Sequence, residues 1–329
     1  MIEAIGLTKQ FDTEYAVRDL DLHVSQGELL ALLGPNGAGK TTTVRMLGAI
    51  LRPTLGRARI NGHDVIAEPD RVRRCIGMLT EQPGLYLRMT GLEYLVFFGR
   101  LYGLPDTVSQ KRALELFERF AMNGAARRRL GTYSKGMRQK VGLIRAMLHD
   151  PAALLLDEPT SAMDPHSARL VRDAIHQLRR DRRGIILCTH NLAEAESLAD
   201  RIAIISQGRI IASGTPDALK RRFLGPPLLE MRLDRPLDGA LDDVADELPD
   251  FITLQSVDGN LLHYHAGDPA VANPLLVKKL TALGIGVVSL HSVPQSLEDV
   301  YLSVLREDEA ARSAPTRRPA IASLQEVVS

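Results

Sequence analysis

The chain has 329 residues, 45% hydrophobic and 25% charged, an ordinary globular composition with room for roughly two domains. Its formal net charge is +1, so no global excess of charge indicates nucleic acid or an anionic membrane as a partner. Cys75 and Cys188 lie in apolar stretches without the spacing of a metal site or a disulfide framework, so we expect reduced core thiols.

The first residues lack the basic start and apolar core of a secretory signal. The sequence also has no run that approaches the roughly 18 apolar residues of a membrane-spanning helix. We therefore expect any membrane role to depend on a partner.

Residues 1–222 alternate short apolar runs with amphipathic stretches, which is typical of an α/β domain. The runs 29–33, 153–156 and 185–188 are apolar throughout, as strands must be when both faces of their sheet are covered. We expect these runs to form central parallel strands. The turn signal at residues 207–208 predicts a hairpin that closes the domain.

A phosphate-binding loop follows the first of these runs, because residues 34–41 read GPNGAGKT and match G-x-x-x-x-G-K-[ST] between a strand and a helix. Gly37 and Gly39 let backbone N–H groups face phosphate oxygens, and Lys40 brings a full charge to the outer phosphates. Thr41 is placed to ligate Mg²⁺ through its hydroxyl. The predicted nucleotide contacts are Gly34, Pro35, Asn36, Gly37, Ala38, Gly39, Lys40, Thr41 and Thr42.

The stretch 85–129 is mostly helical in pattern, which indicates a helical insertion in the α/β frame. Five aromatic residues crowd into it, and the last four recur at helical spacing: Tyr86, Tyr94, Phe97, Phe98 and Tyr102. Two interpretations remain open. The aromatic face is either the insertion's own core or a docking groove for a partner.

Residues 154–158 read LLLDE, a buried strand that brings two carboxylates to its C-terminal end. Open α/β sheets bind their ligands at that end. Because side chains alternate along a strand, we expect different roles for the two groups. Asp157 is predicted to hold the metal, directly or through water, and Glu158 to polarise the attacking water as general base.

A linker rich in proline and glycine at residues 223–227 separates a second unit, residues 228–305. Its pattern predicts a small α+β domain in the order β-α-β-β-α-β, with helices near 237–248 and 270–283. Residues 306–329 are small and polar and predict a flexible tail. Three histidines concentrate in the second unit without carboxylates or cysteines at ligand spacing, so we expect exposed strand residues rather than a metal site. They are His263, His265 and His291.

In this order and spacing, the motifs of residues 1–222 resemble those of the ATP-binding subunits of ABC transporters. Residues 133–137, YSKGM, look like the family's signature, and residues 161–164, SAMD, look like its D-loop. His190 matches the switch histidine. Phe11 sits where the family stacks an aromatic ring on adenine.

This resemblance implies an α/β fold, the P-loop NTPase cassette with antiparallel β and helical subdomains, the latter at residues 85–133. It further implies ATP with Mg²⁺, and Glu158 and His190 as catalytic residues. Glu81 stands where the family's Q-loop usually has glutamine, with Gln82 one residue later. We favour Glu81 as the contact to ATP and the metal.

The resemblance also implies that two subunits pair head to tail. Each ATP would then lie between the phosphate loop of one subunit and the signature of the other. The signature positions that would contact it are Ser134, Lys135, Gly136 and Met137.

The leading hypothesis is the ATPase subunit of an exporter-type ABC transporter, a homodimer bound to a separate permease at the cytoplasmic face of the membrane. The stretch SLEDVYLSVL resembles the ending of ATPases from drug, antibiotic and nodulation-factor exporters. Cargo of a drug-, antibiotic-, lipid- or polysaccharide-like kind is compatible with this.

The alternative is a soluble ABC ATPase that acts on ribosomes or DNA. It is disfavoured because the chain has one Gly-Lys-Thr loop and no long heptad pattern. A scaffold that binds ATP without turnover is disfavoured because the residues for hydrolysis are all present. We interpret the arginine clusters near residues 127–129, 179–183 and 220–222 as solvated helix ends, so no nucleic-acid partner is expected.

Overall fold

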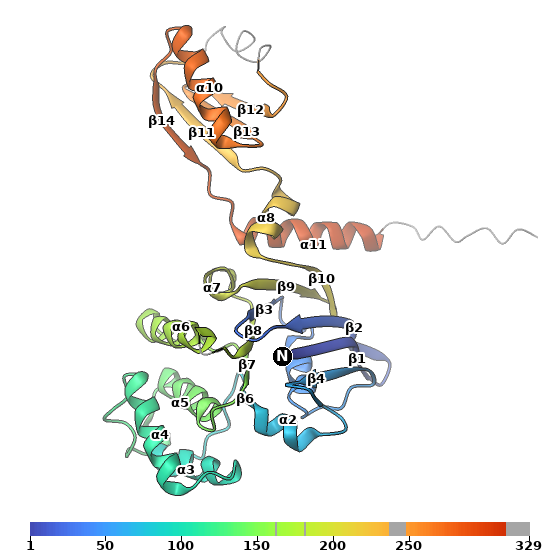
Figure 1. Ribbon diagram of the computed structural model, residues 1–329, viewed down its shortest axis with the longest axis vertical. Coiled ribbons are helices and arrows are strands. Elements are labelled where there is room, and N and C mark those ends of the chain that lie inside the picture. The colour runs from blue at the N-terminus through green and yellow to red at the C-terminus, as the bar shows by residue number, and fades with distance from the viewer. Residues whose placement is uncertain (162, 181, 237–247, 314–329) are drawn as a thin grey trace, which may run out of the picture.

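The computed structural model describes residues 1–161, 163–180, 182–236 and 248–313. Two sheets with surrounding helices form the N-terminal part of the molecule, and a third sheet with one covering helix lies at the opposite end of its long axis (Figure 1).

A six-stranded sheet in the order β10-β9-β3-β8-β7-β6 forms the centre of the N-terminal part. All neighbours pair in parallel except β9 and β10, which form the expected hairpin. Every residue of β3, β7 and β8 is buried, which explains their unbroken apolar sequences and confirms them as central parallel strands. The bounds are β3 (Leu29–Leu33), β6 (Ile76–Leu79), β7 (Ala153–Asp157), β8 (Gly184–Thr189), β9 (Arg201–Ser206) and β10 (Arg209–Gly214).

A second, antiparallel sheet in the order β2-β1-β4-β5 packs beside it. Its inward residues share one hydrophobic core with helix α1 (Lys40–Leu47) and one face of the central sheet. The helix therefore lies between the two sheets and presents its first turn at the end of β3. The strands are β1 (Ile2–Phe11), β2 (Glu14–Val24), β4 (Leu55–Ile60) and β5 (His63–Asp64).

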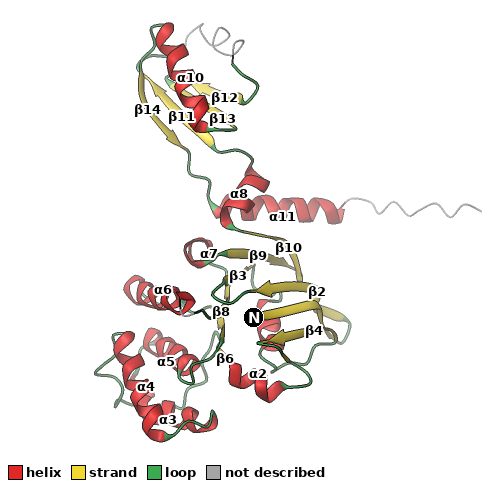
Figure 2. Ribbon diagram, viewed as in Figure 1, coloured by secondary structure: helices red, strands yellow, loops and turns green. Residues whose placement is uncertain are grey.

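The other helices of this part lie mainly on the opposite side of the central sheet, where α3 to α6 gather (Figure 2). Helix α3 begins with a capping box, in which the side chains of Thr90 and Glu93 each accept a hydrogen bond from the other residue's backbone N–H. The bounds are α2 (Pro69–Cys75), α3 (Gly91–Leu101), α4 (Asp106–Arg119), η1 (Leu130–Thr132), α5 (Lys135–Met147), α6 (Pro165–Arg180), α7 (Leu192–Leu198) and α8 (Pro216–Leu224).

The third sheet, in the order β12-β13-β11-β14, is antiparallel and buries one face under helix α10. Along the chain its described elements are three strands, one helix and a fourth strand. The helix expected near 237–248 falls almost entirely outside the described residues, because 237–247 are not described. The elements are β11 (Leu228–Leu233), β12 (Ile252–Asp258), β13 (Leu261–Ala266), α10 (Pro269–Ala282) and β14 (Val287–Ser292).

The last helix, α11 (Leu297–Ser313), does not pack with the third sheet but returns to the N-terminal part (Figure 1). Leu297, Val300 and Val304 are buried in one cluster with Ala195 of α7 and Leu219 of α8. The sequence predicts a flexible tail from residue 306 onward, whereas the helix continues through Ser313. The remainder of the predicted tail, 314–329, lies outside the described residues.

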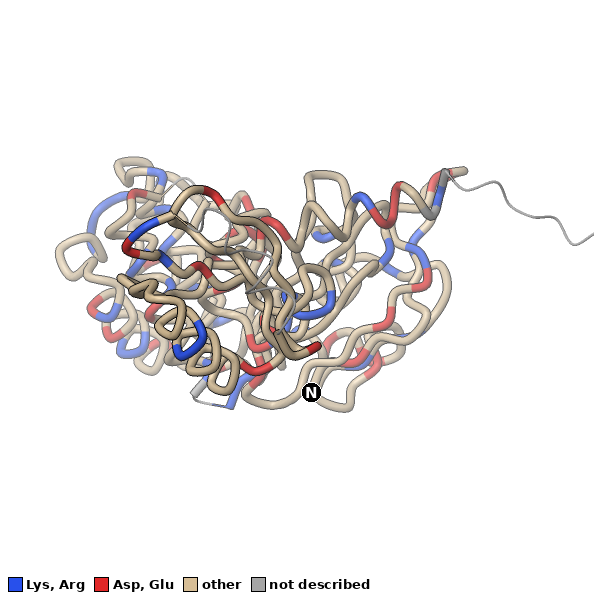
Figure 3. The backbone as a smooth tube through the Cα atoms, turned by 90° about the horizontal axis from the view of Figure 1, so that it is seen from above, with Lys and Arg blue, Asp and Glu red and all other residues tan. Residues whose placement is uncertain are grey.

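Charged positions of both signs are interspersed along the backbone (Figure 3). Members of two arginine-rich clusters form ion pairs: Arg179 with Asp200, Arg183 with Asp150 and Lys220 with Glu196. These cations therefore have acidic partners within the chain, although Arg183 and Lys220 are less exposed than the expected solvated helix ends would be. Within the described ranges, no helix is both long and apolar enough to cross a bilayer.

Candidate nucleotide site

The phosphate loop connects β3 to α1, and its glycines are required by the geometry. Gly37 and Gly39 have φ of 81° and 108°, the left-handed region that side chains disfavour. A Cβ on Gly34 would lie 2.4 Å from the Ile205 carbonyl oxygen, and one on Gly39 would lie 2.6 Å from that of Ala16. No other residue type fits these two positions without moving the backbone.

Lys40 is the first residue of α1 and only 7% exposed. Its ammonium donates to the carbonyl oxygens of Gly34, at 2.5 Å, and Pro35, at 3.0 Å. These two bonds hold the charge across the concave side of the loop, beside the positive end of the helix. A phosphate group there would meet a full positive charge and backbone N–H groups together.

Asp157 ends β7 and lies opposite α1, where its Oδ2 accepts a hydrogen bond of 2.8 Å from the Thr41 hydroxyl. Burial raises the pKa of Asp157, the Thr41 hydrogen bond lowers it, and the nearby charges of Glu158 and Glu81 raise it again. Three carboxylates therefore concentrate negative potential at this point. Such a cluster of hard oxygen donors favours a divalent cation.

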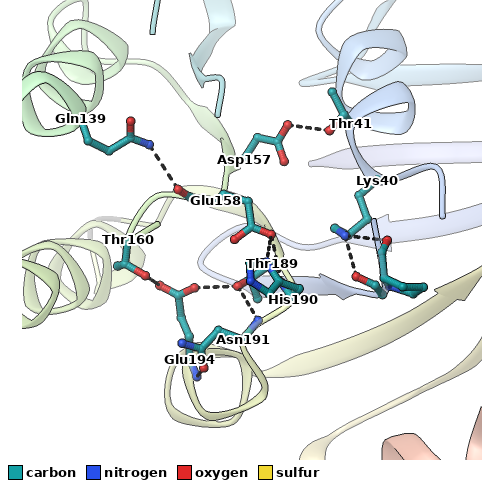
Figure 4. A network of polar contacts seen from close by, with 12 residues as sticks. Lys40, Thr41, Gln139, Asp157, Glu158, Thr160, Thr189, His190, Asn191 and Glu194 are labelled. Atoms are coloured by element: carbon teal, nitrogen blue, oxygen red, sulfur yellow. Dashed lines mark hydrogen bonds and ion pairs between the residues drawn. The ribbon is translucent and has the colours of Figure 1, made fainter. Parts of the chain in front are cut away.

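Glu158, the next residue, has a φ of 51°, uncommon for a residue with a side chain. Its backbone N–H donates to the Cys188 carbonyl oxygen at 2.9 Å, and its own carbonyl oxygen accepts from the Gln139 side-chain amide at 3.2 Å. Strain of this kind costs about 1–3 kcal/mol and persists only where the surroundings impose it. Here the two bonds fix the backbone so that the side chain projects toward β8 (Figure 4).

The side chain of Glu158 meets His190, which follows the last residue of β8. Oε1 of Glu158 accepts from the His190 backbone N–H at 3.0 Å and lies 2.7 Å from its ring Nδ1. Both of these contacts involve Oε1, so neither of them engages Oε2. Parallel pairing of β7 with β8 places the two residues side by side (Figure 4).

These groups face one cavity of about 260 Å³. Glu81 lines it, whereas the Gln82 carbonyl accepts a hydrogen bond from Thr80. Sequence reasoning missed one lining residue, Ala16, because it arrives from β2 and belongs to no phosphate motif. The full lining is Ala16, Asn36, Gly37, Gly39, Lys40, Thr41, Thr42, Glu81, Asp157, Glu158, Ser161 and His190.

Of the predicted loop contacts, Gly34, Pro35 and Ala38 do not line this cavity. Two other groups of predicted contacts also lie outside its lining. Phe11 ends β1, is 48% exposed and has the Lys9 ammonium 5.0 Å from its ring centroid. The signature residues 134–137 begin α5, where the Ser134 hydroxyl accepts from the Met137 N–H at 3.2 Å. Neither group joins the lining within one subunit, and their contacts to ATP stay predictions. Of the predicted D-loop, residue 162 lies outside the described positions.

A buried carboxylate behind the cavity was also missed. Glu194 of α7 is 2% exposed and accepts hydrogen bonds from the hydroxyls of Thr160 and Thr189 (Figure 4). Its only local sequence signal is the cap at Asn191, whose side chain accepts from the Glu194 N–H at 3.1 Å. That signal predicts a helix start but not the tertiary contacts.

Some aromatic residues of the insertion lie in its core, as the first interpretation predicts, and others line a groove, as the second requires. Tyr94 is fully buried, and its ring lies 4.8 Å from that of Phe98, as a core would require. Phe98 and Tyr102 nevertheless also line a groove of about 390 Å³. The groove's other wall comes from the central part of the fold, and Ile50 and Leu101 at its rim are 62% and 66% exposed.

The histidines of the C-terminal sheet require a correction, because a carboxylate does accompany them. Glu230 of β11 lies 3.0 Å from His263 on one neighbouring strand and 3.2 Å from His291 on the other. The spacing of residues along the chain does not reveal this carboxylate, because cross-strand neighbours are remote in sequence. His263 is also largely covered, and His265 lies 3.0 Å from the Pro226 carbonyl. Among the described residues, no three His, Cys, Asp or Glu side chains are arranged to hold a metal ion.

This chain is similar in sequence to known proteins. The family model described as ABC transporter matches residues 17–161. The daunorubicin/doxorubicin resistance ATP-binding protein DrrA of Streptomyces peucetius is 44% identical over 232 residues, 70% of each chain. The daunorubicin resistance ATP-binding protein DrrA3 of Streptomyces coeruleorubidus is 36% identical over 311 residues, 94% of this chain and 97% of that one.

A solved structure described as a dimeric post-hydrolysis state of an ATP-binding cassette, bound to ADP and Pi, superposes with a TM-score of 0.61 at 25% identity. The match covers 65% of this chain and 98% of the solved one. The solved cassette is therefore matched over nearly its whole length.

Proposed function

Because this chain belongs to the ATP-binding subunits of ABC transporters, enzymes that bind and hydrolyse ATP, we propose that it powers export of a drug or antibiotic through a separate permease. One observation carries the site assignment: Lys40, the Thr41–Asp157 pair and the Glu158–His190 pair face a single cavity. The drug-resistance names of the relatives support the class of cargo.

In this proposal Lys40 and the loop N–H groups bind the outer phosphates of ATP. The residues present also fit Mg²⁺, because the Thr41 hydroxyl and the Asp157 carboxylate are oxygen donors 2.8 Å apart and Glu81 adds a third to the same cavity. When bound, the metal supplies charge that offsets the negative charge developing on the transferred phosphoryl group.

Glu158 acts as the general base in this proposal. His190 holds Oε1 at 2.7 Å, which leaves Oε2 to accept the proton of the attacking water. That water forms a bond to the terminal phosphorus while the bond from this phosphorus to the bridging oxygen breaks and ADP leaves. His190 thereby fixes the orientation of the base. The left-handed backbone of Glu158 sets the direction from which this oxygen approaches.

A second copy of the chain would complete each site, as the dimeric cassette of known structure supports. We propose that Ser134, Lys135, Gly136 and Met137 of the partner copy contact ATP from across the interface. The N-terminal end of α5 suits this role, because its backbone N–H groups can donate to the terminal phosphate. ADP lacks that phosphate, so hydrolysis would loosen the dimer.

The permease is proposed to dock in the groove lined by Phe98, Leu101 and Tyr102, which places the ATPase at the cytoplasmic face of the membrane. Its exposed apolar rim, at Ile50 and Leu101, supports a protein partner there. The alternative of a ribosome- or DNA-bound ATPase draws no support from the charged positions, whose signs are interspersed along the backbone (Figure 3).

The variant E158Q tests the proposal. It keeps the phosphate and metal contacts but loses the base, so ATP binding should persist while turnover falls by about 10²–10⁴-fold. ATP hydrolysis, nucleotide binding and dimerisation would be measured on the full chain. Wild-type turnover in E158Q would contradict the assignment of the base.

The same variant, trapped with ATP in cells, should co-purify with a membrane protein. In the double variant E158Q/L101D that protein should be lost while the ATP-bound dimer remains, because Leu101 lies on the surface and not in the core. Ribosomes or DNA in place of a membrane protein would favour the alternative function.

A further inference from the structure

Glu194 is a buried carboxylate that the mechanism above does not use. It lies on α7, away from the cavity lining, and is 2% exposed. Burial raises the pKa of Glu194, and the negative charge of Glu158 raises it further, while the hydrogen bonds from Thr160 and Thr189 lower it. Burying an ionisable group here is costly. A helix that needed only to pack would be better served by an apolar residue at this position.

Both oxygens of this carboxylate have defined partners. Oε1 accepts a hydrogen bond of 2.6 Å from the Thr160 hydroxyl, and Oε2 accepts one of 2.8 Å from the Thr189 hydroxyl (Figure 4). In the second bond the Thr189 hydroxyl donates its proton to Glu194, and its oxygen at the same time accepts from the Asn191 N–H at 3.0 Å.

Each of the two threonines lies close in sequence to one member of the Glu158–His190 pair. Thr160 is two residues beyond Glu158 and immediately before Ser161, which lines the cavity and whose N–H donates to the Glu158 carbonyl at 3.2 Å. Thr189 is the last residue of β8, directly before His190. The carboxylate thus ties the segment after the base to the segment that carries the histidine.

We propose that Glu194 is a positioning residue for ATP hydrolysis, which holds the segment of Thr160 and the end of β8 in the register that brings His190 to Glu158. It touches neither ATP nor the attacking water. Its effect passes through the segments that follow β7 and β8, which end at Asp157 and Thr189. The backbone joins these segments by the hydrogen bond from the Glu158 N–H to the Cys188 carbonyl, and Glu194 adds a side-chain link beyond it. The inference rests on the proposed roles of Glu158 and His190.

The test compares E194A, E194Q and T160V with the matched control E196A in the full chain. Glu196 is on the same helix and pairs with Lys220 of α8, away from the site. In E194A both threonine hydroxyls lose their acceptor, so kcat should fall about 10- to 100-fold through misplacement of the pair, while KM for ATP stays within about threefold.

Conservative replacement separates positioning from mere folding. In E194Q the amide carbonyl can still accept from Thr189 and the amide N–H₂ can donate to Thr160, so most of kcat should return. T160V should lower kcat less than E194A does. The double variant E194A/T160V should be no slower than E194A alone, because both changes break the same link.

Three results would overturn the inference. The first is a kcat in E194A as high as in E196A, and the second is equal losses of kcat in E194A and E194Q that follow equal losses of thermal stability. The third is a rise in KM without a fall in kcat. If turnover stops in E158Q while kcat in E194A is unchanged, only this inference is refuted. Wild-type turnover in E158Q would instead refute the assignment of Glu158 as the base.

Discussion

Replacing His190 by alanine tests the contact that gives Glu158 its orientation. The ring nitrogen lies 2.7 Å from the Glu158 carboxylate, whereas the backbone N–H of the same residue also donates to that oxygen at 3.0 Å and is retained in H190A. The substitution therefore removes one of two anchors. The ring is 60% exposed, so little packing is lost with it.

A hydrogen bond to an ionised group contributes about 1.5–3 kcal/mol. If that contribution serves the transition state, kcat should fall about 10- to 150-fold at about 1.4 kcal/mol per factor of ten. KM for ATP should change little, because Lys40 and the loop are untouched. Steady-state ATP hydrolysis by the full chain measures both constants, with H23A, a change at an exposed strand position, as control. A kcat in H190A within about twofold of wild type would refute the reasoning.

Two further predictions concern stability. L297A in α11 should destabilise the N-terminal part by about 2–5 kcal/mol, because this side chain is 1% exposed and packs against α7 and α8. L302A, on the same helix, should have little effect, because Leu302 is 44% exposed. Equal melting temperatures of the two variants would contradict the packing of α11. Because the pKa of Asp157 is raised in the folded state, nucleotide-free protein should gain stability as pH falls through that raised pKa and lose it as pH rises, and D157N should flatten this dependence in denaturant titrations.

The sequence was sufficient for the local motifs and for the order of the elements. A phosphate loop needs glycines at fixed spacing and a lysine at a helix start, so residues 34–41 predict their own geometry. The buried parallel strands were equally legible, because covering both faces of a sheet removes the alternation of polar residues. The ends of these strands then had to meet at one edge, which brought Asp157, Glu158 and His190 to the loop.

Tertiary structure alone decided the contacts between segments remote in sequence. Ala16 reaches the cavity from the antiparallel sheet, and Glu194 joins Thr160 to Thr189 across two strands. Glu230 meets two histidines only because β11 lies between their strands. The last helix, α11, packs on the N-terminal part although a whole sheet intervenes in the chain. Periodicity shows which face of an element is apolar, but which other element covers it is a property of the folded chain.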